Sequence, residues 1–151
     1  MKRVKEIIKE IERTAHFQQA FIHISFIKNK TDLRNSYETL EFLGDSILNF
    51  STALFLFHSF PHYSEGQMSK LKQLMVQEST LTHLSKEIGL DKYLKTGKVE
   101  KKNHRVSKDR ILADIFESFL AALYLEKGEK LVHEFLNLTL FLWVEGKENM
   151  I

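Results

Sequence analysis

The chain has 151 residues, a length that suits one domain with a proper hydrophobic core. It contains no cysteine, which excludes disulfides and thiolate zinc sites, and its net charge of +2 is too small to indicate a nucleic-acid-binding protein by itself. No uninterrupted apolar run approaches the roughly 18–20 residues of a membrane span, and the N-terminus lacks the apolar core of a signal peptide. We therefore expect residues 1–151 to form a single cytoplasmic domain with no membrane partner.

The sequence pattern predicts a mainly helical protein, beginning with two helices near the N-terminus. Breakers are few, with six glycines and one proline, and no stretch shows a convincing period of two, so we expect an all-α fold. Apolar residues at three- and four-residue steps predict an amphipathic helix over 4–15. The aromatic stretch 17–26 predicts a short helix that ends at His23 or Ser25, and the simplest interpretation of His23 is a partly buried, hydrogen-bonded histidine.

The next helix is more hydrophobic than a surface helix should be. It is expected to begin after an N-cap at Asn35 or Ser36 and to run to about His58. Its predicted inner face consists of large apolar residues at helical spacing, namely Leu40, Leu43, Ile47, Phe50 and Leu54.

Acidic residues interrupt the apolar sequence of this helix and that of a second predicted helix, which contains residues 111–124. Glu38, Glu41 and Asp45 are spaced i, i+3 and i+7, which places them on one helix face. Asp114 and Glu117 share a face of the second helix in the same way. Carboxylates are rarely buried unless they are paired or bind a metal, so these acidic stripes predict a site.

Small residues make a meeting of the two helices possible. Gly44 on the first helix and Ala113, Ala121 and Ala122 on the second allow a close approach. If the helices cross at their acidic stripes, four carboxylates converge on one pocket. Oxygen-only ligation suits a hard cation such as Mg²⁺ or Mn²⁺ rather than zinc.

Between the two acidic helices, Ser64 and Gln67 form the pattern of a capping box. The helix that follows should turn its methionines and leucines inward and Lys70 and Lys72 outward. A further helix over 81–88 should end at the glycine that follows it.

The segment 92–110 contains eight basic residues and two acidic ones, and we expect it to be a loop with short helical turns. It suits contact with a phosphate backbone, although a solvated charged loop is an equally good interpretation. Ser107 is the expected N-cap of the second acidic helix, which should end at Gly128. One last amphipathic helix is expected over 131–142.

Four segments resemble the ribonuclease III family. The run Tyr-Glu-Thr-Leu-Glu-Phe-Leu-Gly-Asp-Ser-Ile-Leu at 37–48 resembles the family signature, and Asp-Arg-Ile-Leu-Ala-Asp-Ile-Phe-Glu-Ser at 109–118 resembles its second acidic motif. Residues 20–26 resemble the early His-x-Ser segment, and 65–72 resemble the Glu-Gly-x-Leu-Thr/Ser helix start. One such motif would be suggestive, whereas four in the right order are specific.

The resemblance implies an all-helical endonuclease domain that cleaves double-stranded RNA to 5′-phosphate and 3′-hydroxyl ends with short 3′ overhangs, in rRNA and mRNA processing. It implies a homodimer, double-stranded RNA as partner, and Mg²⁺ as cofactor with Mn²⁺ as a substitute. Asp45 and Glu117 are the expected catalytic residues. The expected metal ligands are Glu41, Asp45, Asp114 and Glu117.

The resemblance also implies contacts beyond the metal ligands. Phe42 occupies the position that in relatives inserts into a hydrophobic socket on the partner subunit, and the alternative is a core residue. Glu38, Glu65, Lys70 and Lys72 are candidate RNA-contacting residues, although solvent-facing lysines would look the same.

The sequence also leaves alternatives open. Longer relatives continue into a double-stranded-RNA-binding domain about where this sequence stops, and without that domain we expect weaker, more salt-sensitive RNA binding. A catalytically silent RNA-binding or ribosome-associated module on the same fold is one alternative. An unrelated all-α metal-dependent hydrolase of nucleotides or other phosphoesters is another.

Overall fold

The computed structural model of the chain describes residues 1–28, 34–97 and 108–151, and in these residues it is all-helical, as the sequence predicts. An isolated bridge between Ile22 and Lys95 is the only β pairing in the described part. The helical elements in chain order are α1 Lys2–Ile11, α2 Ala15–Ala20, η1 Ile24–Phe26, α3 Glu38–Ser59, α4 Glu65–Val76, α5 Glu78–Ile88, η3 Leu90–Tyr93, α7 Lys108–Lys127, α8 Glu129–Leu138, α9 Leu140–Trp143 and η4 Glu148–Met150.

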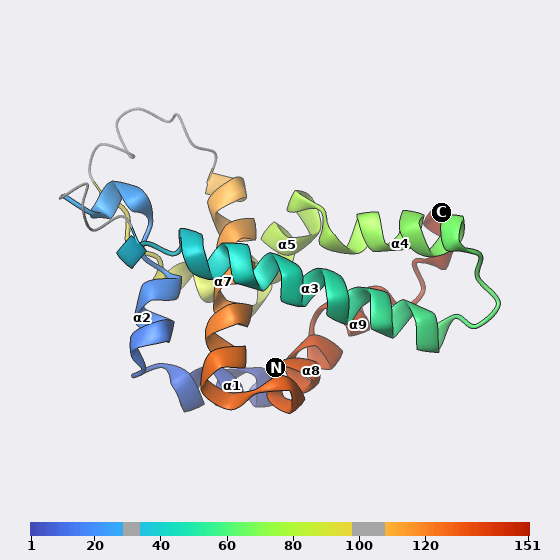
Figure 1. Cartoon of the computed structure of the whole chain (residues 1–151), viewed down its shortest axis with the longest axis horizontal. Coiled ribbons are helices and arrows are strands. Elements are labelled where there is room, and N and C mark those ends of the chain that lie inside the picture. Colours follow the sequence, from blue (N-terminus) through green and yellow to red (C-terminus); the bar gives the residue numbers. More distant parts are fainter. Residues whose placement is uncertain (29–33, 98–107) are drawn as a thin grey trace.

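The helix α7 is the centre of the fold. It packs against α2, α3, α5 and α8, and α3 crosses it steeply in Figure 1. Every residue from Ile111 to Leu123 is buried except Asp114, which is half-buried. A helix that is apolar on all sides belongs in a core, so the acidic side chains of α7 lie at the centre of the molecule rather than on its rim.

Buried serines attach the neighbouring helices to α7. The Ser85 hydroxyl on α5 donates a hydrogen bond to the Leu112 carbonyl at 2.6 Å, and the Ser118 hydroxyl on α7 donates to the Ala20 carbonyl of α2 at 2.5 Å. Both serines are fully buried, so each hydroxyl needs such a partner. These bonds fix the position of α7 relative to the helices on either side.

The inner face of α3 differs from the predicted one. Phe50 and Leu54 were expected inside but are 65% and 40% exposed. The buried positions recur every four residues and include two small ones, which an apolar pattern does not reveal. They are Leu40, Gly44, Leu48, Thr52 and Leu56.

As a consequence, α3 carries an uncovered apolar outer face. Phe42, Phe50 and Phe57 are 79%, 65% and 64% exposed. By length and composition alone α3 is apolar enough to cross a membrane, and it is the one such helix in the described residues. Its inner face nevertheless packs on α7 and acidic side chains project from it, so it is a central helix of a folded domain.

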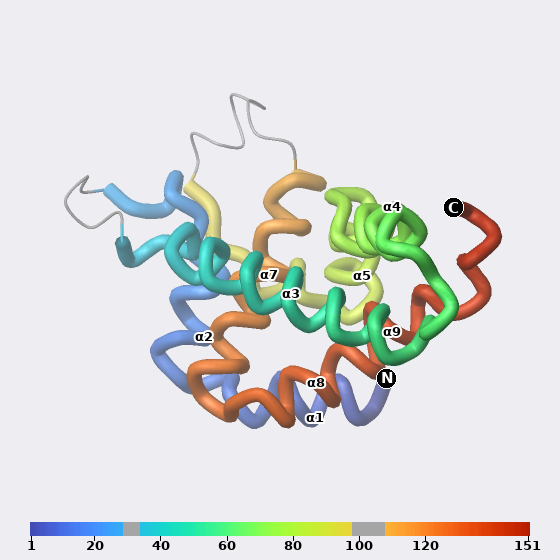
Figure 2. Tube along the Cα trace, turned by 45° about the vertical axis from the view of Figure 1, so that its right-hand side comes forward, coloured from blue at the N-terminus to red at the C-terminus, as the bar shows by residue number. Residues whose placement is uncertain are grey.

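Two predicted helices are broken in the structure. The first ends at Ile11 instead of continuing to residue 15, because Thr14 starts α2 by accepting the Phe17 N–H in its side-chain oxygen at 3.2 Å. The last predicted helix is interrupted at Thr139, whose backbone leaves the helical region at φ −121° and ψ −90°. Figure 2 shows the chain turning there toward the C-terminus.

Most of the other predicted helix ends are confirmed, and one is wrong: the helix predicted over 17–26 ends at Ala20 instead of His23 or Ser25. The capping box of Ser64 and Gln67 opens α4, and α5 ends at Gly89 with a left-handed φ of 80°. The residue before α3, Tyr37, makes no side-chain capping bond, whereas the Ser36 hydroxyl accepts the Glu38 N–H at 3.3 Å, so Ser36, one of the two expected residues, caps this helix start. The expected N-cap of α7, Ser107, lies outside the described residues.

Candidate metal centre

The candidate site lies where α3 crosses α7. Gly44 of α3 meets the main chain of Glu117, and a Cβ atom at position 44 would overlap the Glu117 carbonyl oxygen. Only glycine fits this contact. The close approach places Glu41 and Asp45, which flank Gly44, beside the acidic side chains of α7.

Three carboxylates meet at the crossing. One oxygen from each of Glu41, Asp114 and Glu117 lies within 4.8 Å of the others. Asp45 is not a member of this mutually close group, although its side chain hydrogen-bonds that of Glu117. The crossing predicted from the sequence therefore places the four carboxylates side by side, three of them in one tight cluster.

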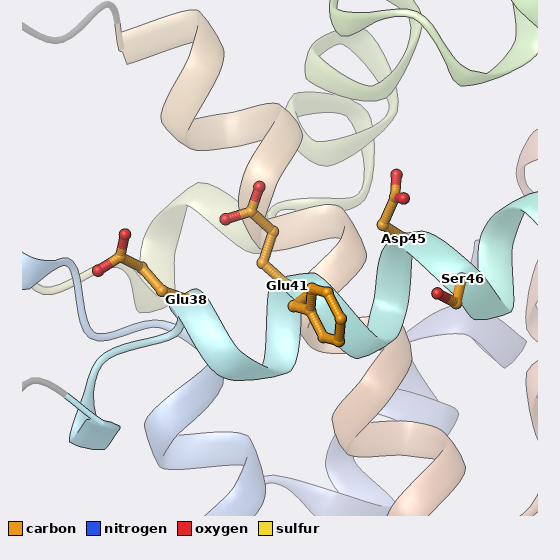
Figure 3. A pocket seen from close by; sticks show the side chains of 5 residues that line it. Glu38, Glu41, Asp45 and Ser46 are labelled. Atoms are coloured by element: carbon orange, nitrogen blue, oxygen red, sulfur yellow. The ribbon is translucent and has the colours of Figure 1, made fainter.

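Figure 3 shows how the acidic stripe of α3 is presented. Glu38, Glu41 and Asp45 project from the same side of the helix, with α7 behind them. Together with Phe42 and Ser46 they line a pocket of about 360 Å³. The stripe inferred from i, i+3, i+7 spacing is thus open to a ligand that approaches α3 from outside.

Two of the carboxylates, Glu41 and Glu117, have raised pKa values in the absence of a cation. Burial, followed by the hydrogen bond and negative charge of Asp45, raises the pKa of Glu117 to about 9. Burial, followed by the charge of Asp114 and the hydrogen bond to it, raises the pKa of Glu41 to about 8, and the positive charge of Arg110 offsets part of this rise. At neutral pH both groups therefore hold protons in the metal-free protein.

These features fit a hard divalent cation. Several oxygen donors converge on one point, and a cation there would stabilise the ionised forms of Glu41 and Glu117 against the burial and repulsion that raise their pKa values. The donors carry no nitrogen or sulfur, so the set suits Mg²⁺ or Mn²⁺ better than zinc. The binding of either ion would release protons.

Tyr37 is a site residue that the sequence analysis missed. Its hydroxyl donates a hydrogen bond to Asp114 Oδ2 at 2.8 Å, and its side chain is 4% exposed. Burial, with the nearby negative charge of Asp114, raises the pKa of Tyr37, so the hydroxyl remains a donor at ordinary pH. A tyrosine one helical turn before Glu41 is the signal that was available.

His23 is buried, as expected, and takes no part in the carboxylate cluster. It is 5% exposed, and its Nδ1 accepts the backbone N–H of Ser25 at 3.1 Å. Its backbone N–H donates to the Lys95 carbonyl at 2.9 Å. The histidine therefore ties the start of the basic segment to η1. Residues 98–107, the greater part of that segment, lie outside the described residues.

The four candidate RNA-contacting residues differ in their exposure to solvent. Glu38, Glu65 and Lys70 are exposed, and Lys72 is half-buried. The Glu65 carboxylate accepts a hydrogen bond from Ser69 at 2.8 Å within α4. Glu38 and Lys70 are therefore the members of this group most accessible to a ligand.

The fold and site define an all-helical domain with a carboxylate cluster where two helices cross, and known proteins share both its sequence and its fold. The Ribonuclease-III-like family model matches residues 14–142. "Ribonuclease 3" of Streptococcus agalactiae is 42% identical over 127 residues, which are 83% of this chain and 56% of that protein. "Ribonuclease 3" of Streptococcus uberis is 37% identical and is matched by 96% of this chain over 66% of its own length. The chain belongs to the ribonuclease III family, and it spans about half to two thirds of the length of these relatives.

A solved structure shares the whole fold. The nuclease domain of ribonuclease III from Campylobacter jejuni matches with a TM-score of 0.75 and 26% identity, over 98% of this chain and 99% of that one. That structure concerns flexibility in the region of the domain involved in dimer formation. The chain therefore corresponds to a ribonuclease III nuclease domain.

Proposed function

We propose that this chain is the catalytic domain of a Mg²⁺-dependent endoribonuclease that cleaves double-stranded RNA to 5′-phosphate and 3′-hydroxyl ends with short 3′ overhangs. The carboxylate cluster of Glu41, Asp114 and Glu117 in a chain of this family is the observation that carries the proposal. Residues 1–151 act as one catalytic domain, and one continuous hydrophobic core supports this. The proposed setting is rRNA and mRNA processing in the cytoplasm.

In the proposed reaction, Glu41, Asp45, Asp114 and Glu117 hold the cation. Bound Mg²⁺ supplies Lewis-acid chemistry, since it lowers the pKa of water and stabilises charge on phosphate oxygens. Glu117 and Glu41 give up their protons when the cation is bound. Glu117 is the most buried ligand and is anchored by the Gly44 contact, so it fixes the position of the site within the fold.

The RNA duplex is proposed to lie along the outer side of α3 and α4. Glu38 and the pocket beside it open in this direction, and exposed Lys70 on α4 is a candidate phosphate contact, with Glu65 and Lys72 as further contacts. An A-form duplex would be recognised through its shape and 2′-hydroxyls rather than its base sequence.

The working form is proposed to be a homodimer in which Phe42 inserts into the other subunit. Phe42 is 79% exposed, which argues against the alternative of a core residue. Burial of an exposed aromatic ring of this size is favourable by about 1.5–3 kcal/mol. A dimer would supply two sites, one for each strand of the duplex.

The proposal is tested by incubating the protein with a long, perfect RNA duplex at low salt, with Mg²⁺ or with a chelator, and by mapping the product ends. Glu117→Gln should lower the rate by more than the 10- to 100-fold that loss of an outer-shell partner of a metal typically costs. Glu129→Gln, an exposed change on α8, is the matched control and should cut normally.

The same assay separates the alternatives. Mg²⁺-dependent cutting by the parent protein and the control, with short 3′ overhangs, would support the proposal. A duplex that is bound but stays intact with both Mg²⁺ and Mn²⁺ would replace it by a catalytically silent RNA-binding module. Hydrolysis of a mononucleotide instead of the duplex would indicate a different phosphoester hydrolase.

A further inference from the structure

We propose that Tyr37 is a positioning residue of the metal centre, whose hydroxyl holds the Asp114 carboxylate in the orientation in which it binds the cation. This inference rests on the proposed metal-dependent function and concerns how one ligand is kept in place. Tyr37 itself would touch neither the substrate nor the cation.

The first observation is the hydrogen bond itself. Tyr37 Oη donates to Asp114 Oδ2 at 2.8 Å, and both side chains are shielded from solvent, Tyr37 almost completely. Within residues 1–28, 34–97 and 108–151, no other hydroxyl, amide or cationic side chain donates a hydrogen bond to Asp114. The side chain of Glu41 also hydrogen-bonds that of Asp114. Glu41 is itself a proposed ligand that loses its proton when the cation binds, so Tyr37 is the donor among the described residues that can still orient Asp114 in the metal-bound site.

The second observation is that repulsion acts on Asp114 whenever its neighbours are ionised. Glu41 and Glu117 have carboxylate oxygens within 4.8 Å of it, and both must lose their protons to bind a cation. Like charges at this distance favour rotation of a carboxylate away from the cluster. The Tyr37 hydroxyl opposes that rotation, because a carboxylate that swings away loses a buried hydrogen bond.

The third observation is that Tyr37 is itself held at both ends. Its backbone N–H donates to the Ile22 carbonyl at 2.8 Å, and its ring packs edge-on against the His23 ring with a centroid distance of 5.8 Å. His23 is in turn fixed by Ser25, whose hydroxyl lies 2.8 Å from Nδ1. A donor mounted this firmly can define where its acceptor points.

A hydrogen bond of this kind has a measurable effect on metal binding. Carboxylates that ligate metals are commonly held by outer-shell hydrogen bonds, and loss of such a partner typically lowers metal affinity 10- to 100-fold. The ring of Tyr37 is part of the core, so Tyr37→Phe removes the hydroxyl and keeps the packing. This substitution isolates the proposed role.

The experiment titrates Mn²⁺ alone into the metal-free protein and measures the free ion by electron paramagnetic resonance. Tyr37→Phe should bind Mn²⁺ about tenfold more weakly than the parent. Tyr124→Phe, which removes an exposed hydroxyl from α7, should bind with the parental affinity. Circular dichroism and thermal unfolding are recorded for each variant so that affinities are compared between folded proteins.

A second background separates positioning from general destabilisation. In Asp114→Asn the Tyr37 hydroxyl has no ligand carboxylate to orient, so adding Tyr37→Phe should weaken Mn²⁺ binding by less than twofold. In Glu41→Gln the same addition should still cost about tenfold.

The outcomes are distinct. Equal affinity of Tyr37→Phe and the parent, or the same loss in both backgrounds, would overturn the positioning role and leave the metal site standing. A parent protein that binds no Mn²⁺ would instead overturn the proposed metal site, and this inference with it.

Discussion

Gly44 of α3 lies against the main chain of Glu117 of α7, at a separation that leaves no room for a side chain on residue 44. The contact determines the site, because Glu41 and Asp45 stand on either side of Gly44 and reach the acidic residues of α7 only at this distance. A glycine in a helix interior costs about 0.5–1 kcal/mol relative to alanine. Here the close packing of α3 against α7, which glycine alone permits, offsets that cost.

Gly44→Ala should therefore push the two helices apart. The added methyl group would meet backbone atoms that cannot rotate away, and overpacking of this kind costs about 1–3 kcal/mol. Chemical denaturation should show that loss, and Mn²⁺ affinity should fall with it. Gly66→Ala is the control: this helical glycine of α4 has only the Ser64 hydroxyl within 4 Å of an added Cβ, so alanine should leave stability unchanged or raise it slightly. Equal effects of the two substitutions would contradict the close-contact argument.

The composition of the site was predictable because it violates the usual pattern of a buried helix. Asp114 and Glu117 interrupt an apolar run, and helical spacing alone places them on one face. Glycine at position 44 likewise indicated a close approach. Spacing and composition were sufficient to predict these site residues, because a site for a hard cation needs charged groups and such groups are otherwise rare in a protein core.

The remaining features depend on tertiary contacts. On α3 the polar Thr52 faces inward and the apolar Phe50 faces outward, the opposite of what their hydrophobicity predicts. The reason is that α3 packs on α7 with the face that carries Gly44. Tyr37 was not assigned to the site: its place one helical turn before Glu41 was a signal, but the sequence does not show that its hydroxyl reaches Asp114, 77 residues away. The last predicted helix is interrupted at Thr139, where the sequence contains no neighbouring proline or glycine that would indicate a break.

The raised pKa values predict a stability profile for the metal-free protein. Glu41 and Glu117 have pKa values of about 8 and 9 when folded, against 4.5 as their usual value, so the folded state binds more protons than the unfolded state between these limits. Their contribution to stability is therefore complete below pH 4.5 and is lost as pH rises toward 9. In chelator, the melting temperature should fall over this range, by about 2–4 °C for each 1 kcal/mol lost.

Glu117→Gln should remove part of that slope and raise the melting temperature at pH 8–9, because the amide carries no charge to repel Asp45. Saturating Mg²⁺ should likewise flatten the profile of the parent protein. Glu129→Gln on α8 is expected to keep the full slope. A parental slope in Glu117→Gln would show that the proton uptake belongs to other groups.

Phe42→Asp should dissociate the proposed dimer without unfolding the subunit. The ring is 79% exposed, so its loss removes little from the core, while the dimer loses about 1.5–3 kcal/mol per ring and gains a repelling charge. Sedimentation analysis should show a dissociation constant at least tenfold higher. Leu125→Asp changes a 45% exposed apolar residue near the end of α7 and should leave the oligomeric state unchanged. A parent that sediments as a monomer at all concentrations would contradict the dimer.

Lys70→Ala should weaken binding to double-stranded RNA and reduce its dependence on salt. An exposed lysine on α4 that contacts one phosphate contributes about 0.9 to the slope of log affinity against log salt concentration, so the variant should lose about one unit of slope. Binding is measured in chelator, where the duplex stays intact, across a series of salt concentrations. Lys130→Ala removes the same charge from α8, which lies on the opposite side of the molecule from α4 in Figures 1 and 2. If both variants change the slope equally, the effect reflects net charge and the duplex does not lie along α4.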